Sequence, residues 1–328
     1  GCSILYISHK LDEIRSLCHH CTVLRGGKVT GEVDPTQETN ASLSRLMIGA
    51  EPPALRHRES TPGGTVLQVK GLSLPKLDQF GTTLDNIWLQ VAEGEIVGIA
   101  GVSGNGQQEL MAALSGEDPR APDESVRLFG KAIGHKTPRQ RREAGLHFVP
   151  EERLGRGAVP GLALSQNTLL TRTHAVSPRG WIDTGAVVHL AKQLIQGFNV
   201  KAGGPASPAK SLSGGNLQKF IVGREIDARP KLLIVSQPTW GVDVGAAAQI
   251  RASLLALRDG GCAVLVVSEE LDELFEVSDR LMVIAKGRLS ASIPTREATR
   301  AQIGEWMSGL WDGHGSNDPT RNPSHAPT

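Results

Sequence analysis

Residues 210–219 contain a Ser-Gly-Gly turn that leads into an amphipathic run. Ser213 is a good helix N-cap, and Gly214 and Gly215 leave the first backbone amides of the coming helix uncovered. Because those amides lie at the positive end of the helix, the turn can hold an anion such as phosphate. Most Ser-Gly-Gly turns only cap a helix, so the neighbouring segments must decide between the two interpretations.

A second glycine-rich segment directly follows a buried strand predicted at residues 95–100. A strand, a glycine loop and a helix in that order are the context that a phosphate-binding loop requires. Gln107 stands where such a loop has the lysine for the β- and γ-phosphates, and Gln108 stands where it has the serine or threonine for Mg²⁺. Losing the charged lysine contact weakens nucleotide binding by about tenfold. A glycine turn that merely joins strand to helix is the alternative. The candidate phosphate contacts are Gly101, Ser103, Gly104, Asn105, Gly106, Gln107 and Gln108.

Two more buried strands are predicted where apolar residues run unbroken, at residues 232–235 and 263–267. Residues 212–218 resemble the signature motif of ABC-type ATP-binding domains, and residues 232–243 resemble their Walker B strand followed by the D-loop. The resemblance implies an α/β fold, in which a P-loop NTPase core carries an antiparallel β subdomain and a helical signature subdomain. It also implies ATP and Mg²⁺ as cofactors. The nucleotide-binding residues that it adds are Ser213, Gly214, Gly215, Asn216 and Asp243.

Five positions depart from the family pattern. Ser236 and Gln237 end the Walker B strand where the family has aspartate and glutamate. Serine is a poor substitute for the carboxylate that holds Mg²⁺, and glutamine has no basic lone pair with which to deprotonate the attacking water. Glu269 stands at the switch position and would repel a γ-phosphate. Together with Gln107 and Gln108, these residues predict that the domain's own pocket does not hydrolyse ATP efficiently.

An internal repeat relates the start of the chain to its end. A shift of 260 residues (269 − 9) aligns residues 1–28 with residues 261–288 without a gap. Residues 7–13 resemble the switch-histidine motif of the family, which implies that His9 reaches a γ-phosphate. Glu269 takes the place of His9 in the second copy, so the two copies are not equivalent.

The repeat predicts the tail of one ATP-binding domain followed by a complete second copy. The tail would begin with a strand at residues 4–7 and a helix at residues 11–17. The expected division is residues 1–49 for the end of the first ABC ATPase domain, 50–65 for a linker, 66–310 for the second domain with its helical subdomain over about 152–225, and 311–328 for a disordered tail.

The family architecture implies two composite nucleotide sites, because its domains pair head to tail. One site would use His9 and the signature at Ser213, with a P-loop and Walker B that lie outside this chain. The other would use the five altered positions. Our hypothesis is one hydrolytic site and one nucleotide-holding or empty site per pair, with no turnover from the printed chain alone.

Residues 148–157 resemble a segment of the second domain in tandem ATPases of simple-sugar and nucleoside importers. The resemblance implies a peripheral position on the cytoplasmic face of the inner membrane. The implied partners are two membrane-spanning permease subunits, an extracytoplasmic solute-binding protein, and the first ATPase domain or another ATPase copy.

The balance of 35 basic and 34 acidic residues among 328 gives no overall field that would draw nucleic acid or anionic lipid. We interpret residues 139–142, with three arginines, as a solvated helix face, because no aromatic residues interleave with them. The longest apolar runs, of about six residues, are too short to cross a bilayer. Residues 18–21, Cys-His-His-Cys, lack a second pair of ligands, so we expect no metal site there.

Two other function classes stay open. A soluble ABC ATPase working on ribosomes or DNA would be favoured by basic arms or a long coiled-coil insertion. A non-catalytic regulatory or scaffold module is favoured by the five altered positions.

Overall fold

The computed structural model describes residues 1–49, 61–176 and 181–311. Most of the expected linker and nearly all of the expected tail lie outside the described residues. Among the described residues, no helix combines the length and the apolar character that crossing a bilayer needs.

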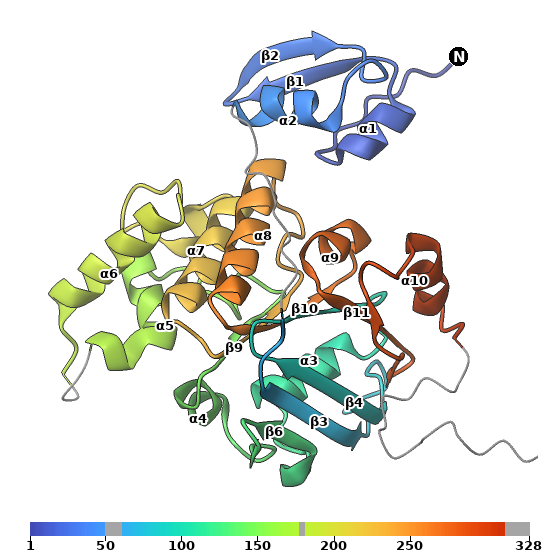
Figure 1. The fold of residues 1–328 in the computed structure, drawn as a ribbon. Helices are drawn as coiled ribbons and strands as arrows, with labels where there is room; N and C mark the ends of the chain where they lie inside the picture. The colour runs from blue at the N-terminus through green and yellow to red at the C-terminus, as the bar shows by residue number, and fades with distance from the viewer. Residues whose placement is uncertain (50–60, 177–180, 312–328) are drawn as a thin grey trace, which may run out of the picture.

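A largely parallel sheet forms the centre of the larger part of the chain (Figure 1). Three of its strands are buried along their whole length, which explains why their sequences are continuous apolar runs. These three confirm the strands predicted near residues 95–100, 232–235 and 263–267. The order across the sheet is β12 (Arg288–Leu289), β11 (Arg280–Ala285), β5 (Ile96–Ala100), β10 (Ala263–Ser268), β9 (Leu232–Ser236) and β8 (Leu146–Val149), with β13 (Ile293–Pro294) paired to β11.

Successive side chains of β5 enter two different cores, because neighbouring residues of a strand point to opposite faces. Val97 and Ile99 join the core that includes α3 (Gln107–Ser115), whereas Ile96 and Ala100 join the core on the other face. Figure 1 shows the helices of that other face above the sheet. They are α7 (Gly214–Asp227), α8 (Val244–Asp259), α9 (Leu271–Val277) and α10 (Arg300–Met307).

An antiparallel sheet lies beyond α3 and confirms the expected β subdomain. Its strands alternate between buried and exposed residues, the pattern of a sheet with one solvated face. Its order is β4 (Leu84–Ala92), β3 (Thr65–Leu74), β6 (Val126–Leu128) and β7 (Lys131–Ala132), and the turn η1 (Asp123–Ser125) precedes β6.

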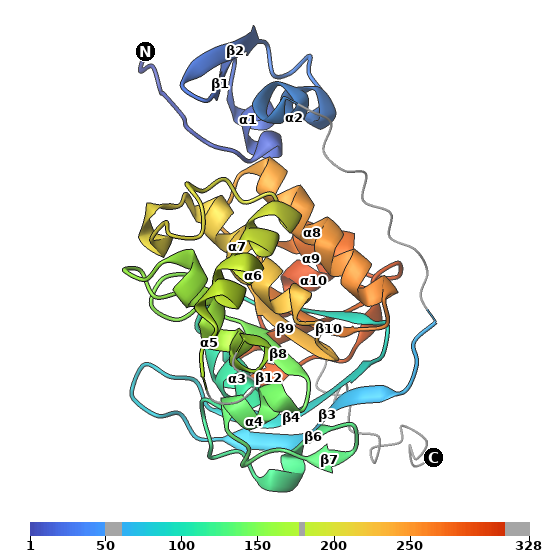
Figure 2. The ribbon, with the colours of Figure 1, turned by 90° about the vertical axis from the view of Figure 1, so that its left-hand side faces the viewer.

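A helical layer packs beside α7, as Figure 2 shows. Asp183 is the N-cap of the amphipathic helix α6. The side chain of Asp183 accepts the amide hydrogen of Ala186. The layer comprises α5 (Leu164–Val176), α6 (Thr184–Gly197) and the turn η2 (Ala209–Ser211), followed by α7. The helices fall within the helical subdomain expected over about 152–225.

The interpretation of residues 139–142 as a solvated face is wrong for two of the three arginines, since Arg142 pairs with the fully buried Glu225. Arg139 is exposed on α4 (Pro138–Glu143), but Arg141 is fully buried. Its guanidinium donates to the carbonyls of Ala113 and Leu114, at 2.6 and 2.7 Å, near the end of α3. Burial lowers the pKa of Arg141 to about 10, which still leaves it charged at neutral pH. The arginine therefore ties α4 to the carbonyl end of α3.

The expected strand at residues 4–7 is absent. Ile4, Leu5 and Ile7 are each more than four-fifths exposed. Their counterparts in β10 pair with β5 and β9 on either side, whereas residues 4–7 pair with no strand among the described residues. A strand needs a neighbour for its backbone hydrogen bonds, so the apolar run forms no strand here. The helix expected at residues 11–17 forms as α1 (Leu11–Leu17), and it is followed by β1 (Cys21–Arg25), β2 (Lys28–Val33) and α2 (Asn40–Ile48).

The 260-residue repeat recurs in the hydrogen bonds. Ser8 donates to Glu13, and Ser268 donates to Glu273, at 3.2 and 2.8 Å. The repeat continues beyond the aligned sequence, because Thr39 caps α2 and its counterpart, residue 299, is a threonine that caps α10. The two segments therefore share a local fold as well as a pattern of residues.

Candidate functional site

Three of the predicted site segments meet at one edge of the central sheet. β5, β10 and β9 are adjacent parallel strands, so their carboxyl ends lie side by side. The glycine loop follows β5, Glu269 follows β10, and Gln237 follows β9. This edge of an open parallel sheet is where such folds bind their ligands.

The glycine loop has the backbone of a phosphate-binding loop. Gly106 adopts φ +108 immediately before α3, a conformation that side chains rarely permit. A Cβ atom there would also lie 3.2 Å from the Cα of Gly287. Thr82 donates its hydroxyl hydrogen to the carbonyl of Gly104 at 2.7 Å, and Asn105 accepts from the amide of Lys286 at 2.8 Å. The loop is held from both sides, with its shape fixed by the protein itself.

Gln107 turns its side chain back into this loop. Its Nε2 donates to the carbonyl of Val102 at 2.7 Å, and its Oε1 accepts from the backbone amide of Asn105 at 3.0 Å. A backbone amide that could face a phosphate oxygen therefore already has an acceptor. The sequence predicted the loss of the lysine charge, but it gave no sign of where the carboxamide would go. Ser103 and Gln108 are exposed beside the loop.

The side chain of Gln237 is also held by hydrogen bonds within the protein. It is buried, adopts φ +48, and its Oε1 accepts from the amide of Glu269 at 3.2 Å and lies 3.4 Å from the hydroxyl oxygen of Ser268. The same Ser268 donates to Glu273, which is 2 % exposed. Burial raises the pKa of Glu273 to about 7, against the hydrogen bonds from Thr239 and Ser268. This chain of side chains links the end of β9 to the end of β10.

The sheet edge carries negative charge. Burial raises the pKa of Glu151, which follows β8, and the nearby carboxylates of Glu152 and Glu269 raise it further. Glu269 itself is exposed. Within the described ranges, no cluster of three or more His, Cys, Asp and Glu side chains could hold a metal ion.

The signature residues form a second group, at the start of α7. Ser213 caps this helix, with its hydroxyl accepting from the side-chain amide of Asn216 at 2.9 Å. Ser213 and Gly214 are exposed, whereas Gly215 is buried where a Cβ would lie 3.1 Å from Oδ2 of Asp243. Asp243 caps α8, so the D-loop and the signature pack together. Exposed amides at a helix N-terminus suit an anion supplied by another surface.

Arg153 joins these two loops and was missed by the sequence reasoning. Its guanidinium donates to the carbonyl of Trp240 and lies 5.8 Å from the centre of that ring. A Cβ on Gly214 would lie only 2.6 Å from its Nη1. Because Arg153 comes from the segment after β8, it mechanically connects that segment to the signature. Its distance in sequence from residues 214 and 240 hides this contact.

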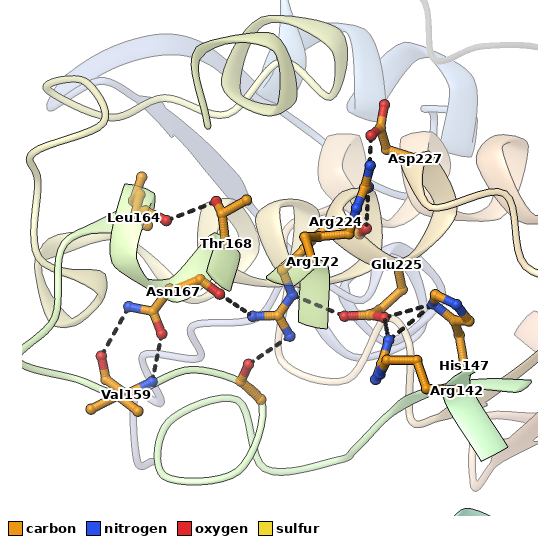
Figure 3. Close-up of polar contacts among 11 residues, drawn as sticks. Arg142, His147, Val159, Leu164, Asn167, Thr168, Arg172, Arg224, Glu225 and Asp227 are labelled. Carbon is orange, nitrogen blue, oxygen red and sulfur yellow. Dashed lines mark hydrogen bonds and ion pairs between the residues drawn. The ribbon is translucent and has the colours of Figure 1, made fainter. Parts of the chain in front are cut away.

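A buried polar cluster anchors the far end of α7 (Figure 3). Glu225 is fully buried, accepts from Arg224 at 2.9 Å and from Arg142, and lies 3.0 Å from Nδ1 of His147. Burial alone would raise the pKa of Glu225, but the two guanidinium groups and the imidazole lower it well below its usual range. Arg224 also donates to the carbonyl of Asn167 at 3.0 Å, so the cluster fixes α7 to both β8 and α5.

His9 is exposed, next to Lys10, and no hydrogen bond joins its side chain to either group among the described residues. The ammonium of Lys10 contacts Glu270, the residue after Glu269. The first-copy segment thus reaches the second copy beside its switch position.

Comparisons with known proteins agree with this geometry. Residues 84–240 match the family model described as ABC transporter. The chain is 39% identical over 312 residues to the nucleoside import ATP-binding protein NupA of Lactococcus lactis, and equally to the guanosine import ATP-binding protein NupO of Bacillus subtilis. Over this range the chain is similar to ABC transporter ATPases. Each alignment covers 94% of this chain but 61% of the relative, so the chain spans about three-fifths of the length of these relatives.

Solved structures confirm the ABC ATPase fold. An ATP-binding subunit of an ABC transporter superposes with a TM-score of 0.59 at 18% identity, covering 74% of this chain and all of that chain. A dimeric ATP-binding cassette bound to ADP and Pi superposes with a TM-score of 0.61 at 20% identity, covering 71% of this chain and all of that chain.

The residues of the chain's own pocket are a poor fit to Mg²⁺ with ATP. Neither Gln107 nor Gln108 offers the charge or the hydroxyl that the triphosphate and the metal ion require. Ser236 and Gln237 supply no carboxylate, and Glu269 faces the same edge with negative charge. The signature group, in contrast, places Ser213 and Gly214 at the surface at the start of a helix, which suits an anion.

Proposed function

We propose that this chain is the C-terminal part of a tandem ABC ATPase that energises import of a simple sugar or nucleoside. Residues 1–49 end the first ATPase domain, and residues 66–310 form the second. The recurrence of hydrogen bonds and caps at a spacing of 260 residues supports this division. The import names of the relatives support the transport role.

One observation supports different roles in ATP hydrolysis for the two copies. The signature at Ser213 and Gly214 is intact and exposed, whereas the domain's own glycine loop is occupied by Gln107. The second domain therefore supplies its signature to a hydrolytic site that the first domain completes with its P-loop, its Walker B strand and His9. ATP and Mg²⁺ bind mainly at that composite site, where Mg²⁺ neutralises phosphate charge.

Within that site, the residues of this chain bind and orient rather than transfer protons. The amides after Ser213 hold phosphate oxygens, which requires the pair of domains to be closed. His9 donates a hydrogen bond to the γ-phosphate. Asp243 keeps the signature and the D-loop in register through its cap on α8.

The proposed partners follow from the import role. Two membrane-spanning permease subunits receive the helical subdomain at about residues 152–225, and an extracytoplasmic solute-binding protein delivers the solute. The ATPase is peripheral, on the cytoplasmic face of the membrane. Arg153 gives the permease-facing segment a direct contact with the signature loop.

ATP turnover by the tandem protein, with its upstream domain present, tests the proposal. Ser213→Arg places a long side chain over the exposed amides, and we expect turnover to fall by at least 100-fold. Gln107→Ala should change turnover less than twofold. Ser211→Arg, at an exposed serine two residues earlier, is the matched control. Equal losses in Ser213→Arg and Gln107→Ala would show that the altered pocket is needed for catalysis.

A non-catalytic regulatory or scaffold module is the second candidate, favoured by the occupied loop and by buried Gln237. The same experiment separates the two functions. A tandem protein that binds its permease subunits but shows no turnover with or without Ser213→Arg would support the scaffold role.

A further inference from the structure

Lys10 and Glu270 form an ion pair between the two copies of the repeat. The Nζ atom of Lys10 lies 3.0 Å from one carboxylate oxygen of Glu270 and 3.4 Å from the other. Their separation in sequence, 270 − 10, is the 260 residues of the repeat. The two partners are therefore equivalent positions of the two copies.

Their equivalence is structural as well as sequential. Lys10 precedes α1 with φ −83 and ψ 105, and Glu270 precedes α9 with φ −83 and ψ 101. The backbone amide of Lys10 donates to the hydroxyl of Ser8 at 3.0 Å, and that of Glu270 donates to Ser268 at 3.1 Å. Both residues occupy the same place in the same turn.

Equivalent residues of two paired copies meet each other where the symmetry axis passes. A residue away from a twofold axis contacts a different residue of the partner, so a contact between positions 10 and 270 marks the axis. We propose that Lys10 and Glu270 lie on the local twofold axis between the first and second ATPase copies, and that their opposite charges favour pairing of unlike copies. This inference rests on the proposed tandem function.

The charges of Lys10 and Glu270 act by determining which copies of the ATPase domain pair with each other. The side chains are 49% and 38% exposed, and exposed ion pairs contribute little to stability. Two first copies would bring lysine against lysine at the axis, and two second copies would bring glutamate against glutamate. Such juxtaposed like charges are a means of rejecting the wrong partner.

A second contact between the copies lies away from the axis. Ile48, at the end of α2, packs over Gly245 in the first turn of α8, where a Cβ would lie 3.3 Å from the isoleucine side chain. This contact joins non-equivalent positions, as expected away from the axis. It gives a reporter of the pairing whose own residues take no part in the ion pair.

Zero-length carbodiimide coupling of the purified full-length protein tests the placement. We expect mass spectrometry of the monomer band to find an amide bond between Lys10 and Glu270. Lys10 also lies 3.8 Å from Glu13 within its own segment, which makes that link an internal control for reactivity. Lys10→Arg should abolish both links. A Lys10–Glu13 link without a Lys10–Glu270 link would overturn the placement.

Charge reversal tests the choice of partner. In a protein carrying Ile48→Cys and Gly245→Cys, with Cys2, Cys18 and Cys21 replaced by serine, bismaleimide coupling reports the contact between α2 and α8. We expect Lys10→Glu to reduce coupling several-fold, and Lys10→Glu with Glu270→Lys to restore it. If Lys10→Glu alone leaves the coupling unchanged, the charges do not select the partner copy. ATP turnover is measured separately. If the cross-links form but ATP is not hydrolysed, the proposed function is contradicted and the pairing of the copies is not.

Discussion

Gln107 shows how a single side chain can change what a loop is able to bind. Its carboxamide both donates to and accepts from the loop that its own helix follows. A lysine at this position could donate but could not accept, so the amide of Asn105 would be released. The altered residue thus removes a charge and also fills a hydrogen-bonding position.

Restoring the lysine should therefore strengthen nucleotide binding to the domain's own pocket. We expect Gln107→Lys to raise ATP affinity about tenfold, because a charge-assisted contact replaces a neutral one and the Asn105 amide becomes available. Fluorescent-nucleotide titration measures the change. Gln108→Lys adds the same charge at the exposed neighbour and controls for general attraction. Equal gains from both variants would contradict a role for the loop geometry.

Glu273 should make stability depend on pH. Its folded pKa, about 7, is above the ordinary value of 4.5, so the folded state binds this proton more tightly than the unfolded state. The stabilisation is complete below pH 4.5 and is lost as the pH rises towards 7, on the order of 3 kcal/mol in total. Denaturant unfolding at pH 5 to 8 should show Glu273→Gln gaining stability relative to wild type over this range. The exposed Glu305→Gln should track wild type, and a constant difference for Glu273→Gln would refute the titration.

At the scale of the elements, α7 connects the exposed signature to the buried cluster around Glu225. The helix begins beside the exposed Ser213 and Gly214 and ends among the paired side chains of the Glu225 cluster. A shift at either end must therefore move the whole helix. The cluster keeps the signature at a fixed position relative to the sheet.

Removing the acid from this cluster should be costly. Glu225→Ala leaves Arg224 and Arg142 without their shared carboxylate, and we expect a loss of about 3–5 kcal/mol in the free energy of unfolding. Asp227→Asn is the matched control on the same helix, because the pair of Asp227 with Arg172 is partly exposed and contributes less than about 1 kcal/mol. Urea denaturation measures both. Similar losses would mean that burial does not set the energy of these pairs.

The strands were predictable because their apolar runs are local signals. β5, β9 and β10 were placed within about one residue of their ends from their sequences alone. Burial of Arg141 was not predictable, since its acceptors are carbonyls about 27 residues away in α3. The two groups of site residues followed from motif order, but Arg153 and the fold-back of Gln107 depend on tertiary contacts and rotamers. Those contacts leave no periodic trace in the sequence.

At the scale of the whole molecule, the larger part of the chain carries its own cores. Both main hydrophobic clusters consist of residues from Val66 onward, although Ile14, Val23 and Leu43 are buried within the first segment. The first segment touches the rest through α2 and Lys10. Folding of the second domain should therefore be independent of it.

Deleting residues 1–61 should leave the thermal midpoint of the second domain within a few degrees of that of the full chain. No apolar area from these main cores is lost, and an exposed ion pair contributes little. Differential scanning calorimetry checks this. Deleting residues 300–311, which removes buried Ile303 from α10, should instead lower the midpoint clearly. A destabilised domain after the N-terminal deletion would mean that the copies fold as one unit.

Ile4, Leu5 and Ile7 carry a practical consequence for handling the protein. Three exposed apolar side chains on a backbone that pairs with no strand in the described part of the chain are a template for strand addition by a neighbouring molecule. Preparations of this chain should scatter light increasingly with concentration, while those of a variant that begins after this segment should stay clear. Aggregation, and not catalytic activity, will then determine which version of the protein crystallises.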